Sequence, residues 1–206
     1  RIFSASDAAE ALWPSDNEWG VPALDVRYQA EALALPVTKW GSLARTKSLG
    51  GTIHFYTDDY KFRALWDDPS PKLNARCLNV VEPNFSTNIH MPPAVVLWLT
   101  FQKRWLARWW QSHGVRVFVD LNVEPCFTDL NRLGVPDGWR AFATRALESG
   151  DGLDVIATHY ETACQIRGND DVLFVVFGGN APTERLCQDH GWAYVPEYRL
   201  GVAVNG

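Results

Sequence analysis

The chain has 206 residues, of which 24 are acidic and 19 basic, so its formal net charge is −5. This balance excludes a polybasic tail for nucleic-acid binding, and the 47% apolar content excludes an intrinsically disordered chain. At this length we expect one domain with a sizeable core. The 10 tryptophans are several-fold more than an average chain carries, so much aromatic surface must be buried or used in contacts.

Two absences in the sequence predict a cytoplasmic protein without a membrane among its partners. No apolar run approaches the ~20 residues of a membrane span, and the N-terminal Arg1-Ile-Phe-Ser lacks the apolar region of a signal peptide. The four cysteines are widely spaced, which favours reduced thiols over a zinc ribbon or a disulfide framework. They are Cys77, Cys126, Cys164 and Cys187.

Residues 1–50 are expected to form an irregular arm that packs on the core. Three prolines and three glycines interrupt this segment, and a short helix is expected near residues 6–13. Trp13, Trp19 and Trp40 would supply the apolar contacts of the arm. Residues 51–206 are then expected to form a single α/β domain.

From Gly51 onward, strand-like and helix-like segments alternate. The strands are expected at residues 52–56, 78–81, 115–119, 140–144, 172–177 and 193–195, and the helices at residues 58–66, 91–113, 153–167 and 183–190. The alternation predicts an α/β fold with a mostly parallel sheet of five to six strands, open or curled into part of a barrel. The helix over 91–113 is apolar nearly all round, which predicts that it is largely buried.

Several motifs occur in an order shared with a known family. They are the run from Gly51 to Trp66, Asn84-Phe-Ser86, Met91-Pro92, the helical stretch from Trp98 to Trp105, Gly134-Val-Pro-Asp-Gly138 and Val175-Val-Phe-Gly178. Together they resemble domain of unknown function 4417, a family of phage, plasmid and bacterial proteins, over roughly residues 50–180. The resemblance implies a mobile genetic element as the setting and supplies no biochemical activity. The family pattern has Asp, Tyr and Arg where this chain has Asn84, Phe101 and Gln102, so a site through these positions lacks one carboxylate.

Three acidic residues stand where the expected parallel strands end, which is where α/β proteins usually bind ligands. Asp58 follows the first strand, and Glu82 and Asp120 directly follow the next two. We predict these three as the catalytic residues, with Asp120 and Glu82 as the first choices. If they converge, their carboxylates would hold a divalent metal ion for metal-assisted hydrolysis. The alternative is that each acid caps or begins the helix after its strand.

The basic residues are concentrated in one segment, since residues 83–119 hold four of them and no acid. Lys103, Arg104 and Arg108 lie in the Trp-rich helix, and Arg104 and Arg108 share a face. Arginine beside tryptophan is a common way to hold phosphates and stacked bases, so these three predict a nucleic-acid contact. The alternative is a solvated stripe of a buried helix, which the net charge of −5 favours.

Two further features have an ordinary structural explanation. His54 lies within an expected strand and is expected to be a core histidine with its hydrogen bonds satisfied. Gly178-Gly179 would let a backbone approach a phosphate, but a tight turn explains the pair equally well.

Three functions are left open by these observations. The first is a nucleic-acid-associated role in replication or maintenance of the mobile element, with nucleic acid as the partner. The second is a small metal-dependent hydrolase or nuclease that uses the strand-end carboxylates. The third is an interaction protein that binds a host protein through exposed tryptophans.

Overall fold

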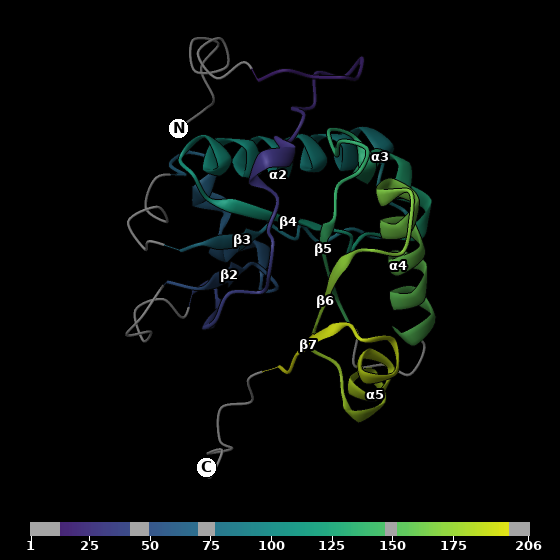
Figure 1. Cartoon of the computed structure of the whole chain (residues 1–206). Helices are drawn as coiled ribbons and strands as arrows, with labels where there is room; N and C mark the ends of the chain where they lie inside the picture. The colour runs from purple at the N-terminus through teal and green to yellow at the C-terminus, as the bar shows by residue number, and fades with distance from the viewer. Residues whose placement is uncertain (1–12, 42–49, 70–76, 147–151, 198–206) are drawn as a thin grey trace.

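A computed structural model of the chain describes residues 13–41, 50–69, 77–146 and 152–197 (Figure 1). In these residues seven strands form one parallel sheet whose spatial order follows the sequence. The strands are β1 (Val37–Lys39), β2 (Thr52–His54), β3 (Asn79–Val81), β4 (Arg116–Asp120), β5 (Ala141–Arg145), β6 (Leu173–Phe177) and β7 (Ala193–Val195).

The sheet is curled until it is nearly a barrel. Side chains from β2 and β6, which are four positions apart in the sheet, meet across its inner face. The ring centroids of His54 and Phe177 are 4.7 Å apart, and those of Tyr56 and Phe177 are 4.9 Å apart. In a flat sheet four strand spacings would separate these strands by roughly 19 Å. The expected α/β fold with a parallel sheet and a partial-barrel shape is therefore confirmed.

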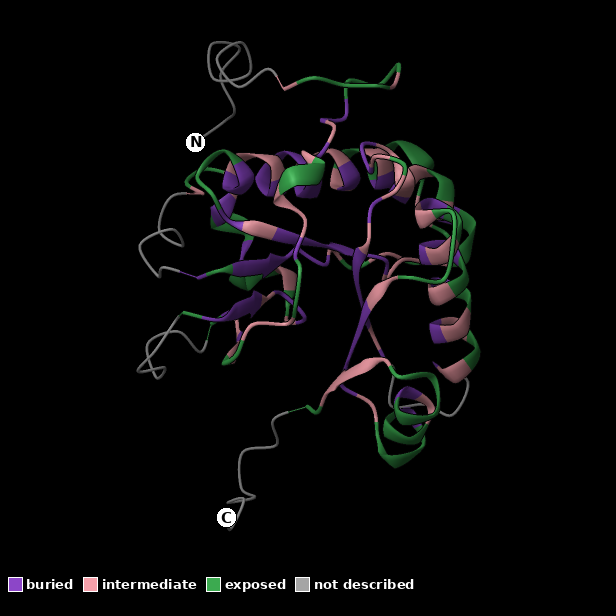
Figure 2. Ribbon diagram, in the orientation of Figure 1, coloured by how far each residue is buried: buried purple, intermediate pink, exposed green. Residues whose placement is uncertain are grey.

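The helices cover the outer face of the curled sheet. They are α2 (Pro93–Ser112), α3 (Thr128–Arg132), α4 (Gly152–Arg167) and α5 (Ala181–His190). Four 3-10 turns accompany them, η1 (Val26–Tyr28), η3 (Asp59–Lys61), η4 (Arg63–Leu65) and η6 (Pro125–Phe127). Figure 1 shows α2 along one side of the sheet, α4 along the next side and α5 beyond β7. The helix sides that face the strands are buried and their outer sides are exposed (Figure 2).

Because successive residues of a strand point to opposite faces, the sheet has two cores. On the outer face, the Phe55 ring stacks on Trp110 of α2, with centroids 5.5 Å apart and ring planes within 2°. In the inner core, the members from β5 are the small Ala141 and Ala143, which leaves room for larger side chains from the neighbouring strands. The inner core consists of Ala30, Tyr56, Val81, Phe118, Ala141, Ala143, Val175 and Phe177.

The sheet has seven strands where the sequence predicts five to six. The additional strand, β1, lies in the N-terminal segment that we expected to be irregular. It has three residues, too few for a periodic pattern, and it pairs with β2 from Val37 opposite Thr52 to Lys39 opposite His54. The helix expected near residues 6–13 lies outside the described residues.

The helix expected at residues 58–66 is instead a pair of 3-10 turns, η3 and η4. Asp58 stands at the cap position of η3 but its side chain makes no capping hydrogen bond. A helix of this length is costly to nucleate without such support. Phe62 and Leu65 are still fully buried, so the apolar face that the pattern predicts is used in a different backbone conformation.

Replacing Trp110 with alanine should destabilise the fold strongly, because its side chain is fully buried between the outer face of the sheet and the rest of α2. We expect a loss of about 3–5 kcal/mol in the free energy of unfolding, measured by urea denaturation. Trp98→Ala on the same helix is the control, since Trp98 is 47% exposed, and it should cost clearly less. Equal losses in the two variants would contradict this packing of α2.

Candidate functional site

Asp120 is the centre of a buried polar network at the carboxyl end of β4. Its side chain is fully buried, and its Oδ1 accepts hydrogen bonds from the Tyr56 hydroxyl at 2.9 Å and the Asn122 backbone N–H at 3.1 Å. Its Oδ2 accepts from Asn84 Nδ2 at 3.1 Å and from Lys103 Nζ at 3.3 Å. Groups from the ends of β2, β3 and β4 and from α2 therefore meet at this one carboxylate.

Burial changes the protonation balance of the titratable groups in this network. Loss of solvent raises the pKa of Asp120, although the neighbouring Lys103 acts in the opposite direction. Loss of solvent also lowers the pKa of Lys103 and raises the pKa of Tyr56 well above its usual value. Lys103 therefore holds its proton less firmly than a lysine in water does, and Asp120 is a better proton acceptor than an exposed aspartate. Tyr56 remains a hydrogen-bond donor.

A second buried ion pair supports the network from the end of β3. The carboxylate of Glu82 and the guanidinium of Arg104 are both fully buried and in contact. Glu82 Oε2 also accepts the Asp120 backbone N–H at 3.1 Å. Arg104 also donates Nε–H to the backbone carbonyl of Leu133, at 2.9 Å, and an Nη2–H to that of Asn131. Because every charged group in this pair has its partners, Glu82 and Arg104 fix the spacing of β3, β4 and α2.

The structure brings two of the three predicted acids together. Glu82 and Asp120 share the buried network, as the carboxyl ends of adjacent parallel strands require. Asp58 stands apart on the surface: its side chain is 61% exposed and its Oδ2 lies 2.7 Å from Lys61 Nζ. The helix-capping alternative does not describe Glu82 or Asp120, because neither begins a helix.

The two buried carboxylates do not form a ligand set for a divalent metal. Glu82 already faces Arg104 and Asp120 already faces Lys103, so a cation would meet a buried positive charge at each carboxylate. Asn84, which stands where the family pattern has Asp, turns an amide N–H toward Asp120 and acts as a donor. Within the described ranges, no three His, Cys, Asp or Glu side chains are grouped to hold a metal ion.

The basic residues of α2 are buried, which neither of the two sequence-based interpretations anticipates. The side chains of Lys103 and Arg104 are 4% and 0% exposed, so the solvated stripe is wrong. A bound polyanion could not reach either cation in this conformation. Arg108 is nearer the surface, with its guanidinium 4.8 Å from the Trp13 ring and 3.9 Å from the Asp25 carboxylate. Lys103 and Arg104 point inward because each pairs with a buried acid, Asp120 at the end of β4 and Glu82 directly after β3.

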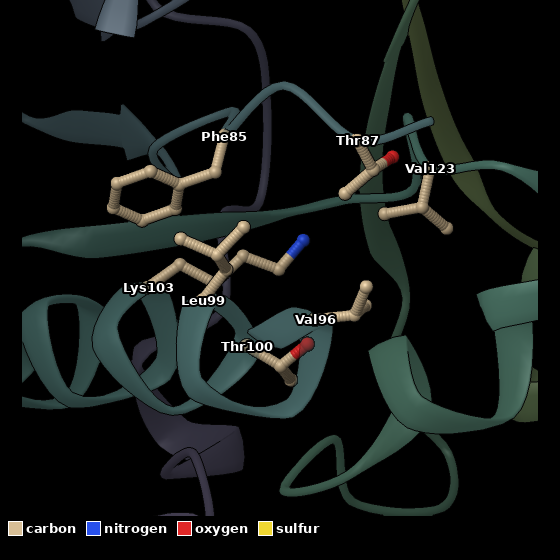
Figure 3. Close-up of a pocket in the computed structure, with 7 residues that line it drawn as sticks. All are labelled: Phe85, Thr87, Val96, Leu99, Thr100, Lys103 and Val123. Carbon is tan, nitrogen blue, oxygen red and sulfur yellow. The ribbon is translucent and has the colours of Figure 1, made fainter. Parts of the chain in front are cut away.

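Lys103 also lines a small pocket between α2 and the segments that follow β3 and β4. Figure 3 shows the Lys103 side chain extending from α2 with its nitrogen in the space below Thr87 and beside Val123. The lining residues are Phe85, Thr87, Val96, Leu99, Thr100, Lys103 and Val123. Apolar groups dominate this lining, so the pocket keeps bulk water away from the amine while offering two threonine hydroxyls.

Sequence reasoning missed three members of the network or their roles. Tyr56 ends an alternating run with Thr52 and His54, which is the signal that it faces the inner side of the sheet. Asn84 was visible only as a departure from the family pattern. Lys103 was visible only as part of a basic cluster, and nothing in the sequence indicates that it reaches Asp120.

The expected tight turn at Gly178-Gly179 agrees with the structure. Both residues have positive φ, at 75° and 83°, and a Cβ at Gly179 would lie 2.4 Å from the Thr183 hydroxyl oxygen. The Gly178 N–H is already used, because it donates to the Val195 carbonyl at 2.9 Å.

Comparison with known proteins places the chain in a family. Residues 13–138 match the family described as Domain of unknown function (DUF4417). The chain belongs to this family. The matched range begins before and ends before the range of roughly 50–180 over which the motifs resemble the family. It includes β1 to β4, α2 and all residues of the Asp120 network.

Two curated relatives of this DUF4417 protein come from phages. The Gene 1 protein of Mycobacterium phage L5 is 39% identical over 71 residues, which is 33% of this chain and 31% of the phage protein. The Gene 1 protein of Mycobacterium phage D29 is 34% identical over 104 residues, which is 48% of this chain and 37% of the phage protein. The chain thus spans about a third of the length of these relatives, and the domain is phage-associated. No solved structure matches the chain.

The described helices include none with the length and apolar character that a membrane crossing requires. The longest, α2, instead carries buried charges toward the sheet.

Removing the Lys103 amine should leave Asp120 as a buried charge without its cation. We expect Lys103→Met to lower the free energy of unfolding by about 3–5 kcal/mol at neutral pH. The deficit should shrink as the pH falls, because protonated Asp120 needs no cation and its pKa is already raised. Urea denaturation over a pH series measures both effects.

Lys61→Met is the matched control for this variant. Lys61 also pairs with an aspartate, but both partners are exposed, so little stability should be lost at any pH. A Lys103→Met deficit as small as that of Lys61→Met, or one that does not change with pH, would contradict the buried Lys103–Asp120 pair.

Proposed function

We propose that this phage-associated protein is an enzyme whose active site is the network of Asp120, Lys103 and Tyr56. The observation that carries the proposal is direct contact between a buried carboxylate, a buried amine and a buried phenol at the carboxyl edge of a curled parallel sheet. That edge is where α/β enzymes place their reacting groups. Buried titratable groups with opposed pKa shifts are characteristic of acid–base sites.

Stability alone is a weak reason for such a network. Removing two opposite charges from water costs about as much as their attraction returns, so apolar residues of similar size would stabilise the fold equally well. The Glu82–Arg104 pair already joins β3, β4 and α2. Lys103 and Asp120 add a second buried pair. Lys103 lines the pocket, whereas neither Glu82 nor Arg104 does.

The network supports proton transfer without a metal ion. In the proposed step, the ammonium of Lys103, held by Asp120 Oδ2, gives its proton to a leaving group of the substrate. The neutral amine that remains then takes up a proton from a weakly acidic group or from water, which restores the ammonium beside Asp120. Tyr56 donates to Asp120 Oδ1 throughout and so keeps that carboxylate oriented toward Lys103.

The wider setting of the reaction is proposed as phage nucleic-acid metabolism. The relatives support the phage part of this proposal. The burial of Lys103 and Arg104 directs the proposal away from a duplex bound on α2 and toward a small substrate. The metal-dependent hydrolase is not retained, because Glu82 and Asp120 each face a buried cation.

The test is a turnover screen of nucleoside phosphates and short DNA and RNA oligonucleotides in the presence of EDTA. We expect the wild type to convert at least one of them and Asp120→Asn to be reduced by about 100-fold or more. Asp171→Asn is the control, because Asp171 is an exposed acid in ion pairs with two arginines. Three results would overturn the proposal: no turnover of any compound, turnover that requires an added metal, or equal activity of Asp120→Asn and Asp171→Asn.

A further inference from the structure

Three basic side chains converge on the inner face of the sheet, on the side of Tyr56 opposite Lys103. Lys39 of β1 and His54 of β2 are register partners, so their side chains point to the same face. Arg145 ends β5 and is the register partner of Phe177 on β6, and the Phe177 ring contacts the His54 ring. The curl of the sheet thus brings together groups that are far apart in the sequence.

This cluster of Lys39, His54 and Arg145 lacks the anions that would balance it. Burial lowers the pKa of His54 to about 3, and the positive charges of Lys39 and Arg145 act in the same direction. No carboxylate of the described chain lies within ion-pair distance of Lys39. Arg145 has one acidic neighbour, Glu197, at 3.5 Å, and that side chain is 34% exposed. Like charges held together without a buried counter-ion indicate a site for an anion.

His54 also has an unsatisfied polar atom. Its Nδ1 is buried and has no hydrogen-bond partner among the described residues, contrary to the expectation of a satisfied core histidine. Buried polar atoms in folded proteins nearly always have a partner, so this nitrogen is available to a group from outside the chain. Lys39 and Arg145 are partly exposed, which leaves this end of the inner face open to a ligand.

Aromatic rings border the basic cluster. The His54 and Tyr56 rings have centroids 5.7 Å apart, and both rings pack on Phe177. Tyr56 and Phe177 are buried and pack on each other, so they form an apolar wall beside the basic cluster. The Tyr56 hydroxyl leads directly from these rings to Asp120, 2.9 Å away.

We infer that Lys39, His54 and Arg145 form an anion subsite that binds the phosphate of a nucleotide, with the aromatic rings of Tyr56 and Phe177 beside it. This inference rests on the proposed function, because it names the substrate class of the Asp120 site. The phosphate replaces Glu197 as the partner of Arg145 and supplies the acceptor that protonated His54 requires.

The test is calorimetric titration of the whole chain with AMP, adenosine and inorganic phosphate, without metal. We expect AMP to bind more tightly than adenosine, and inorganic phosphate to compete with it. Arg145→Gln should weaken AMP binding by about tenfold or more, the loss of one charge-assisted contact. Arg140→Gln is the matched control, since Arg140 is similarly exposed and also paired with one acid, Asp171, at 2.9 Å. It should bind AMP as the wild type does.

A second measurement reports on the site itself. In 15N NMR spectra, the His54 ring nitrogens should shift on adding AMP or phosphate, because an anion raises the pKa of His54 toward its ordinary value. Any of three results would overturn the inference. AMP and phosphate fail to bind, Arg145→Gln and Arg140→Gln weaken AMP binding equally, or the His54 spectrum does not change.

The two proposals fail in different ways. Asp120→Asn should keep AMP binding, because Asp120 is not a member of the anion subsite. Turnover in the screen that is lost in Asp120→Asn, with AMP and phosphate binding absent, would remove the subsite and leave the active-site proposal standing. AMP binding without turnover of any substrate would remove the active-site proposal and leave the anion subsite standing.

Discussion

A carboxylate placed in a protein interior needs several hydrogen-bond donors, and Asp120 obtains them from separate elements. Tyr56, Asn84, Lys103 and the Asn122 backbone each hold one position around it. Each donor fixes the distance between its own element and β4. The Asp120 carboxylate therefore constrains three features of the fold: the curl of the sheet at β2, the loop after β3 and the rotation of α2 about its axis.

The rotation of α2 shows how far this requirement reaches. The helix has enough apolar residues to bury almost any face, and it leaves Val95 and Trp98 exposed while burying Lys103, Arg104 and Gln111. Lys103 and Arg104 pair with acids at the ends of β4 and β3, and Gln111 bonds the backbone at Asp25 and Tyr28. Polar contacts therefore decide which face of an apolar helix is inside. The same contacts place an amine beside a carboxylate at the edge where this fold class binds ligands.

Much of the fold could be predicted from the sequence because it depends on local patterns. The apolar runs at β3, β4 and β6 and the proline and glycine at the ends of α2 located these elements closely. β1 could not be predicted, since three residues carry no period and the strand exists only through its pairing with β2.

The site was predictable only in part. Asp120 and Glu82 follow from the rule that parallel strands end at one edge. Their partners do not, because Lys103 and Arg104 lie on a different element and their direction depends on helix rotation. The basic inner face was hidden for a similar reason. Lys39 and His54 become neighbours through the pairing of β1 with β2, and Arg145 approaches them only when the sheet curls.

The central claim is that Lys103 and Asp120 form a buried, reactive ion pair. The most direct measurement is the pKa of the Lys103 amine, followed by NMR on 15N-lysine-labelled protein, with Lys61 as the exposed reference. We predict that Lys103 titrates below the ordinary lysine value of about 10.4, and lower still in Asp120→Asn, where the stabilising negative charge is gone. A Lys103 amine that titrates at or above the ordinary value, or that does not respond to Asp120→Asn, would contradict the account.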